Sequence, residues 1–307
     1  MTRRAIEEQV RAGVEVLSDG QIRWSDPISH IAGRLDGVEV HGLLRYFDTN
    51  CYFRQPVVRA QPTRARQIVV DEYLFARNTL GLMPTTKDMA GQLTIRPVLT
   101  GPYTLAKYSQ SRTREFASLE DRAIAYAEAL AEEIKGLAQA GATWIQIDEP
   151  AVIKYPGDFT IFRRAFQKLT VGREKPALVG RKIHIALCVY FHDVVPLYEK
   201  LSDLPVDLLG MDFTYNPKLV DVIASAGSTV PLGLGLVDAR NTKLEDPEAV
   251  ARQIEKMLPK ISGERACLGP SAGLEFLPRD RAFAKLELLG RIRAAVTGER
   301  AAAGARR

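Results

Sequence analysis

Two adjacent carboxylates are the side chains in this sequence best placed for chemistry. Asp148 and Glu149 follow a short apolar run at residues 143–147 and precede Pro150. In a parallel barrel, a carboxylate at the C-terminal end of a buried strand lies at the end where such enzymes bind their substrates. The competing interpretation is structural: the pair caps the next helix or forms a salt bridge in a loop. The position favours the functional interpretation.

A histidine and two thiols are the other candidate reactive groups. Cys188 lies four residues after His184, on the same face of a predicted strand, because side chains alternate along a strand. His184 is either a metal ligand or a hydrogen-bonded core histidine, and Cys188 and Cys267 are either ligands or small core residues. Cys51 is expected to serve packing alone.

The elements that carry these groups alternate in type from residue 90 onward. Short apolar runs predict strands at residues 93–99, 143–147, 183–189, 206–211, 230–237 and 266–268, with one earlier strand at 14–17. Amphipathic spacing predicts helices at residues 3–12, 119–140, 159–169, 194–201, 217–226, 247–258 and 279–296.

Near-continuous apolar strands separated by helices indicate parallel strands that are buried on both faces. No glycine-rich phosphate-binding sequence follows any of these strands, which favours a closed (β/α)8 barrel over an open doubly wound sheet. The alternation within residues 37–60 predicts a β-hairpin insertion. We expect a single barrel domain over residues 1–297 and a disordered tail over 298–307. Because only seven barrel strands can be identified, we also expect the first strand to lie upstream of Met1.

Composition and charge exclude several classes of binding partner and cellular location. The net charge is +5, and no stretch combines clustered basic residues with interleaved aromatic ones, which argues against a nucleic-acid partner. The three cysteines are far apart and odd in number, so no disulfide framework is expected. No apolar run is long enough to span a membrane, and no signal peptide precedes the first helix. We expect a cytoplasmic protein.

Several short strings, in order along nearly the whole chain, resemble the catalytic half of cobalamin-independent methionine synthases, especially the short single-domain type. The strings are residues 99–105 (LTGPYTL), 145–151 (IQIDEPA) and 269–274 (GPSAGL), with supporting matches at 19–20, 53–57, 235–238 and 285–286. This resemblance implies a barrel enzyme that transfers a methyl group to a thiol.

The resemblance also implies a zinc ion, since coordination deprotonates a thiol into the nucleophilic thiolate. Family members hold zinc with a His-x-Cys pair, a glutamate and a final cysteine. In this chain the candidate ligands are His184, Cys188, Asp212 and Cys267. Ala186 stands where the first cysteine is expected, with Cys188 about 7 Å further along the strand. Ala272 stands where the last cysteine is expected.

The same resemblance assigns roles at the substrate site. It implies that Asp148 binds the substrate ammonium group together with Glu149. Gln21 replaces a glutamate that helps this binding, and Tyr108 replaces a tryptophan that stacks on folate. Asp238 and Arg240 are the remaining candidate catalytic residues. Arg240 replaces a histidine proposed as an acid; because an arginine does not cycle a proton at neutral pH, it is suited instead to bind a carboxylate or phosphate.

The sequence therefore predicts a methyltransferase that acts on homocysteine, with a corrinoid protein, methylcobalamin or a folate as the methyl donor. One alternative is a zinc-free barrel enzyme, an alkyl transferase or lyase that acts on another small acid. Another is a non-catalytic accessory barrel. The altered ligand set keeps these alternatives open.

Overall fold

A computed structural model describes residues 1–83, 93–171, 182–262 and 266–298. Contacts divide the chain into two units. The first contains Met1–Ile6 and Ser18–Val189, and the second contains Glu7–Leu17 and the chain from Tyr190 onward. Helix α1 (Thr2–Arg11) is shared between them. Within the described residues, no helix is long and apolar enough to cross a membrane.

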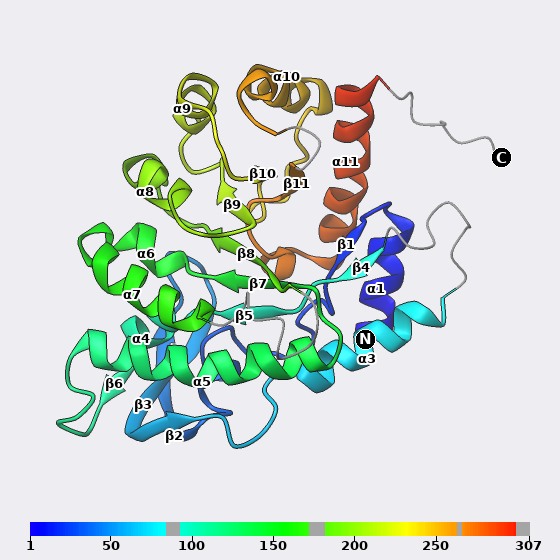
Figure 1. Ribbon diagram of the computed structural model, residues 1–307. Coiled ribbons are helices and arrows are strands. Elements are labelled where there is room, and N and C mark those ends of the chain that lie inside the picture. Colours follow the sequence, from blue (N-terminus) through cyan, green and yellow to red (C-terminus); the bar gives the residue numbers. More distant parts are fainter. Residues whose placement is uncertain (84–92, 172–181, 263–265, 299–307) are drawn as a thin grey trace. The chain divides into compact units, whose positions relative to one another are not determined.

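A parallel ladder forms the centre of the first unit (Figure 1). It consists of β5 (Val98–Thr100), β7 (Trp144–Asp148) and β8 (His184–Val189), and most of their side chains are buried. The register aligns Thr100 with Asp148 and Asp148 with Cys188, so the strands end level with one another.

Helices follow strands β5 and β7 of this ladder. They are α4 (Pro102–Tyr108), α5 (Leu119–Gln139), α6 (Pro150–Lys154), the 3-10 turn η1 (Pro156–Asp158) and α7 (Phe159–Thr170). Helix α5 begins where Ser118 Oγ accepts the Asp121 N–H at 3.0 Å. The chain leaves this helix through Gly141, whose φ of +98° suits glycine. Helix α5 packs against α4 and α7, and also against β3 of the hairpin described next (Figure 1).

The predicted hairpin insertion is confirmed. Strands β2 (Asp36–Arg45) and β3 (Tyr52–Thr63) pair antiparallel, and β6 (Gln110–Ser111) adds to β3 in parallel. Tyr46, Phe47 and Phe53 are buried at the base of its turn. The hairpin is therefore fixed to the unit by aromatic packing. The first unit also contains α2 (Ser29–Ala32), α3 (Val70–Gly81) and β4 (Thr94–Ile95).

A second parallel ladder forms the centre of the second unit, from β9 (Leu208–Asp212), β10 (Leu232–Val237) and β11 (Cys267–Pro270). The strands approach closely at Gly235, where a Cβ atom would lie 2.4 Å from the Met211 carbonyl oxygen. The remaining elements are β1 (Val16–Leu17), η3 (Val195–Leu197), α8 (Tyr198–Ser202), α9 (Lys218–Ala226), α10 (Pro247–Met257), η4 (Leu258–Lys260), η6 (Leu274–Phe276) and α11 (Arg279–Thr297).

Most predicted elements are confirmed, with boundaries that agree within two residues. The predicted strand at 93–99 is instead two short strands, β4 and β5, because Pro97 lies between them and cannot donate a ladder hydrogen bond. Helices α2, α3, α4 and α6 were not predicted. Helix α4 is short and apolar on most sides, so it lacks the helical period in its sequence. Most of the predicted tail lies outside the described residues, and both the single domain and the upstream strand stay predictions.

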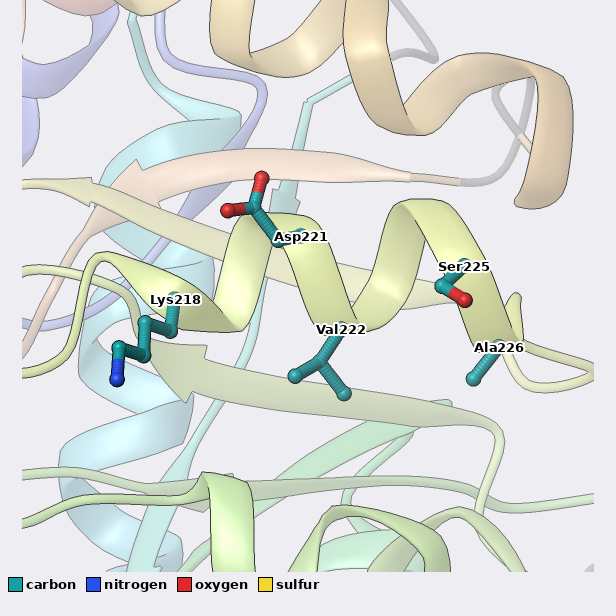
Figure 2. A pocket seen from close by; sticks show the side chains of 5 residues that line it. All are labelled: Lys218, Asp221, Val222, Ser225 and Ala226. Carbon is teal, nitrogen blue, oxygen red and sulfur yellow. The ribbon is translucent and has the colours of Figure 1, made fainter.

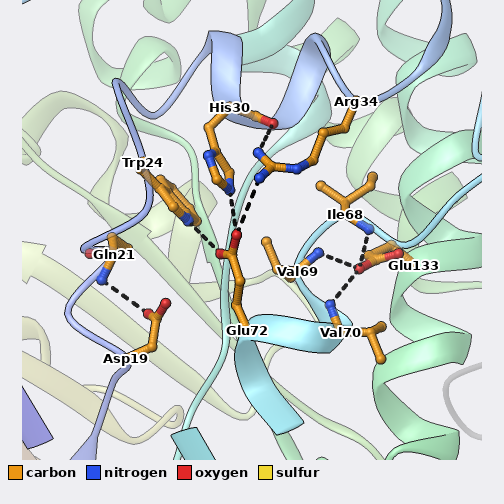
Figure 3. Close-up of polar contacts among 10 residues, drawn as sticks. All are labelled: Asp19, Gln21, Trp24, His30, Arg34, Ile68, Val69, Val70, Glu72 and Glu133. Atoms are coloured by element: carbon orange, nitrogen blue, oxygen red, sulfur yellow. Dashed lines mark hydrogen bonds and ion pairs between the residues drawn. The ribbon is translucent and has the colours of Figure 1, made fainter. Parts of the chain in front are cut away.

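Glu133, on α5, holds the start of α3 in place (Figure 3). Its carboxylate is fully buried, and Oε1 accepts the backbone N–H groups of Ile68, Val69 and Val70 at 3.0, 2.7 and 3.0 Å. Its other oxygen pairs with Arg64. One buried side chain thus satisfies three N–H groups where α3 begins, which a helix cannot satisfy internally.

We predict that Glu133→Ala lowers the free energy of unfolding by about 3–5 kcal/mol, because it leaves buried N–H groups and Arg64 without their acceptor. Urea unfolding followed by circular dichroism measures the change. The matched control is Glu132→Ala on the same helix, whose side chain is 54% exposed and pairs with Lys135. That variant is expected to change stability by about 0.5 kcal/mol or less. Equal losses in the two variants would contradict the assignment.

Candidate functional site

Asp148 and Cys188 lie side by side at the C-terminal edge of the first ladder. Asp148 is the last residue of β7, and its register partner on β8 is Cys188. The Gln146 side-chain amide donates to Asp148 Oδ1 at 2.7 Å, and Asp148 is 9% exposed. This geometry brings together one predicted substrate-binding carboxylate and one predicted ligand thiol.

Glu149 has a different environment from its neighbour. Its carboxylate is fully buried and accepts the N–H groups of Tyr103 at 2.9 Å and Thr104 at 2.7 Å, together with the Thr104 hydroxyl at 2.6 Å. A Cβ atom at Gly101 would lie 2.3 Å from this carboxylate, so glycine is required there. Burial raises the pKa of Glu149 to about 7, although these hydrogen bonds lower it in part. Glu149 thus anchors the start of α4, a helix that precedes it in the chain, and not the helix that follows it.

Gln21 lies in a tight turn that also holds Asp19. The Gln21 N–H donates to Asp19 Oδ1 at 3.0 Å, and Gln21 itself has a φ of +46°. Burial raises the pKa of Asp19, and the nearby charge of Glu72 adds to this effect. Figure 3 shows the turn beside the polar group formed around Glu72.

That polar group was not singled out from the sequence. Glu72 Oε2 accepts the Trp24 indole N–H at 3.0 Å, and Glu72 Oε1 lies 3.1 Å from His30 Nε2 and 3.3 Å from Arg34 (Figure 3). Burial alone would raise the pKa of Glu72, but the contacts with His30, Trp24 and Arg34 lower it below its ordinary value. Glu72 lies 38 to 48 residues further along the chain than the other three, so no local spacing identifies the group.

Tyr108, the predicted stacking residue, is part of an aromatic cluster beneath the hairpin. Its ring meets those of Phe47 and Phe53 edge-on, with centroids 5.4 and 5.3 Å away. Burial raises the pKa of the Tyr108 hydroxyl. These contacts give Tyr108 a packing role, and its role towards a substrate stays a prediction.

Asp212, in the second unit, has both carboxylate oxygens engaged. It is the last residue of β9 and is 1% exposed. Oδ1 accepts the Thr214 N–H at 2.8 Å and the Thr214 hydroxyl at 2.7 Å, and Oδ2 accepts the Phe191 N–H at 3.2 Å. Phe191 has a φ of +75°, a costly conformation for a bulky residue. Asp212 therefore holds a strained turn in place.

Asp238 and Arg240 lie in the loop after β10, at the C-terminal edge of the second ladder. Asp238 Oδ1 accepts the Arg240 N–H at 2.8 Å, and Asp238 Oδ2 accepts the Asn241 amide. The Asp238 N–H in turn donates to Glu245 at 2.9 Å, and Glu245 pairs with the fully buried Lys285 at 3.0 Å. Lys285 of helix α11 thus holds this loop in place through Glu245.

The four predicted metal ligands do not fit a single ion. His184 is the first residue of β8 and stacks on Trp144 with centroids 4.7 Å apart, so it lies about 13 Å from Cys188 along the strand. Cys267 is the first residue of β11, about 7 Å along the ladder from the level of Asp212. Zinc ligands must lie about 2.0–2.3 Å from a common point. In the part of the chain that the structure describes, no three His, Cys, Asp or Glu side chains form a metal-binding group.

A surface pocket on α9 is a poor alternative site. Figure 2 shows that its lining comes from this one helix. Its acid, Asp221, pairs with Lys256 at 2.5 Å. The lining lacks the thiols and strand-end carboxylates of the predicted chemistry; it consists of Lys218, Asp221, Val222, Ser225 and Ala226.

Solved structures show the same fold. A B12-independent methionine synthase from Shewanella sp. W3-18-1, in complex with selenomethionine, aligns with a TM-score of 0.77 and 21% identity, over 97% of this chain and 86% of that one. A putative vitamin-B12 independent methionine synthase from Listeria monocytogenes aligns with a TM-score of 0.72 and 16% identity, over 95% and 84%. Together with the two parallel ladders, this likeness confirms the predicted α/β barrel class.

Sequence comparison identifies the family. The family model "Cobalamin-independent synthase, Catalytic domain" matches residues 1–295. Methionine synthase from Saccharolobus solfataricus is 30% identical over 281 residues, which are 91% of this chain and 78% of that protein. Methionine synthase from Thermococcus kodakarensis is 29% identical over 282 residues, 92% and 77% respectively. The chain belongs to the catalytic-domain family of cobalamin-independent synthases and is a methyltransferase of the methionine synthase type.

The raised pKa of Glu149 predicts that the stability of the protein depends on pH. Because its pKa is about 7 in the folded chain and 4.5 ordinarily, the folded state binds more protons than the unfolded state between these values. The contribution to stability is present below pH 4.5 and is lost as the pH rises to about 7, by on the order of 3 kcal/mol. Unfolding free energies of the parent and of Glu149→Gln, measured from pH 4.5 to 8, check this. A constant difference between the two proteins would show that the group does not titrate there.

The separation of the predicted ligands gives a second expectation. Cys267→Ala should leave both the zinc content and the zinc affinity of the purified protein unchanged, because Cys267 lies at the start of its strand. Plasma mass spectrometry and titration with a competing chelator measure these quantities, with Cys51→Ala as the control. Loss of bound zinc in Cys267→Ala alone would overturn the geometric argument.

Proposed function

We propose that this methyltransferase moves a methyl group to the thiol of homocysteine, with Asp148 as the group that binds the substrate ammonium. The observation that carries the proposal is the position of Asp148. Its carboxylate is nearly buried, lies at a strand end beside Cys188, and is oriented by Gln146. The family relatives, which are named methionine synthases, support the reaction class.

The place of Asp148 at the end of β7 supports this role. Glu149 already accepts three hydrogen bonds that fix the backbone of α4. The Asp148 carboxylate lies one residue earlier, at the end of the strand itself. A charged hydrogen bond between carboxylate and ammonium is stronger in such a poorly hydrated position than in water. This hydrogen bond would fix the orientation of the bound amino acid, so that its thiol always lies at the same position in the site.

Thiol activation is a separate requirement of the reaction. A thiol with a pKa near 8.5 is mostly protonated at neutral pH and reacts poorly. The resemblance supplies zinc for this step, but His184, Cys188, Asp212 and Cys267 do not fit one ion. The proposal therefore gives this chain the tasks of binding and orienting the acceptor, and it assigns no step to a metal.

The methyl donor is the second open part of the reaction. The sequence leaves a corrinoid protein, methylcobalamin and a folate as candidate donors, whereas the matched family is described as cobalamin-independent. This description favours methyltetrahydrofolate. Parallel assays with methyltetrahydrofolate and methylcobalamin, with methionine detected by mass spectrometry, separate the two donors.

We predict that Asp148→Asn lowers kcat/KM for homocysteine by roughly 100-fold, because it removes the charge that pairs with the ammonium group. Steady-state methionine formation measures the loss, and circular dichroism verifies folding. The matched control is Asp71→Asn, an exposed aspartate of the same unit, which should keep activity within about two-fold. Methionine formation that is equally fast in Asp148→Asn and its parent would exclude this role, and no turnover with either donor would exclude the reaction.

Two observations favour a second candidate function. Arg240 stands in the loop where the resemblance implies an acid, and the predicted zinc ligands do not come together. These features suit a barrel enzyme that transfers an alkyl group to another small acid. Turnover with an anionic thiol other than homocysteine, under conditions that yield no methionine, would support this candidate.

A further inference from the structure

Arg240 lies against two aromatic rings in the second unit. Its guanidinium carbon is 5.5 Å from the ring centroid of Phe191 and 5.5 Å from that of Tyr215. Cations at this distance are attracted to the ring faces, and this attraction does not use up the N–H donors of the guanidinium. We call Arg240, Phe191 and Tyr215 the arginine cluster.

Contacts with neighbouring residues hold the arginine cluster in place. Phe191 is 2% exposed, and its ring also meets Phe276 edge-on at 5.5 Å. Its unfavourable positive φ is maintained by Asp212, which accepts the Phe191 N–H. On the other side, Asp238 fixes the backbone of Arg240. Strain that is held by a buried carboxylate is typical of functional positions.

The neighbouring acids are engaged by other donors. Asp212 accepts from Phe191 and Thr214, Asp238 accepts from the Arg240 backbone and Asn241, and Glu245 pairs with Lys285. Among the described residues, no acid forms an ion pair with the Arg240 guanidinium. Its Nε–H is buried without a hydrogen-bond partner there. A buried donor on a cation without a partner is costly, and an anionic ligand would relieve that cost.

From these observations we propose that the arginine cluster is an oxyanion-binding site, which recognises a carboxylate or phosphate group of a ligand through the Arg240 guanidinium. The planar fork of an arginine matches both groups in a bidentate manner. The site deepens the proposed function and rests on it only for the identity of the ligand: the anion is the carboxylate of the amino-acid acceptor or an anionic group of the methyl donor.

Direct anion binding is the first test. The intact chain is titrated calorimetrically with inorganic phosphate and with succinate in chloride-free buffer, where saturable binding is expected. Arg240→Met should weaken binding at least ten-fold, whereas Arg252→Met, at an exposed arginine of α10, should leave it unchanged. Tyr215 is 40% exposed, so Tyr215→Leu tests the cluster without disturbing the core, and it should weaken binding about three-fold. Unsaturable binding, or equal binding by the parent and Arg240→Met, overturns the proposal.

Kinetics distinguish the source of the anion. If Arg240 binds the carboxylate of the acceptor, Arg240→Met should lower kcat/KM for homocysteine at least ten-fold. It should leave kcat/KM unchanged for 3-aminopropanethiol, which lacks the carboxylate. If Arg240 binds an anionic group of the methyl donor, Arg240→Met should raise the KM for the donor equally with both acceptors. The calorimetric result does not depend on turnover, so failure of the anion site and failure of methyl transfer remain separate outcomes.

Discussion

Buried carboxylates must find hydrogen-bond donors, and this constraint shapes both units. Glu133 holds the start of α3, Glu149 the start of α4, and Asp212 the strained turn at Phe191. In each case the donors are mainly backbone N–H groups that no helix or strand satisfies. Because an unsatisfied buried polar group costs about 1–3 kcal/mol, these acids decide where helices begin and which turns persist. Asp148 differs from them, because the donor found for its Oδ1 is a side-chain amide.

The pattern of elements was readable from the sequence because strands and helices leave different periods of apolar residues. That is why the helix at Leu119–Gln139 and the hairpin at residues 37–60 were predicted closely. The family followed from short strings such as IQIDEPA, whose order along the chain is specific. These strings also identified Asp148 as a strand-end carboxylate.

The details of the site were not readable, because a shared strand face does not show whether two side chains are close enough to bind one ion. His184 and Cys188 share a strand face, yet one begins the strand and the other lies near its end. Cys267 also begins its strand. The cluster of Trp24, His30 and Glu72 was missed because only tertiary packing brings it together. Sequence likewise gave no sign that Glu149, beside Asp148, would be fully engaged by α4.

The ion pair between the fully buried Lys285 and the part-buried Glu245 limits the motion of the loop after β10. Glu245 also accepts the Asp238 N–H, so the loop that carries Arg240 is tied to a charge within helix α11. Moving this loop outward would leave a fully buried lysine without its counterion, at a cost of several kcal/mol. An open form of the loop would then be populated at about 1% or less. Helix α11 therefore restrains the loop through this ion pair.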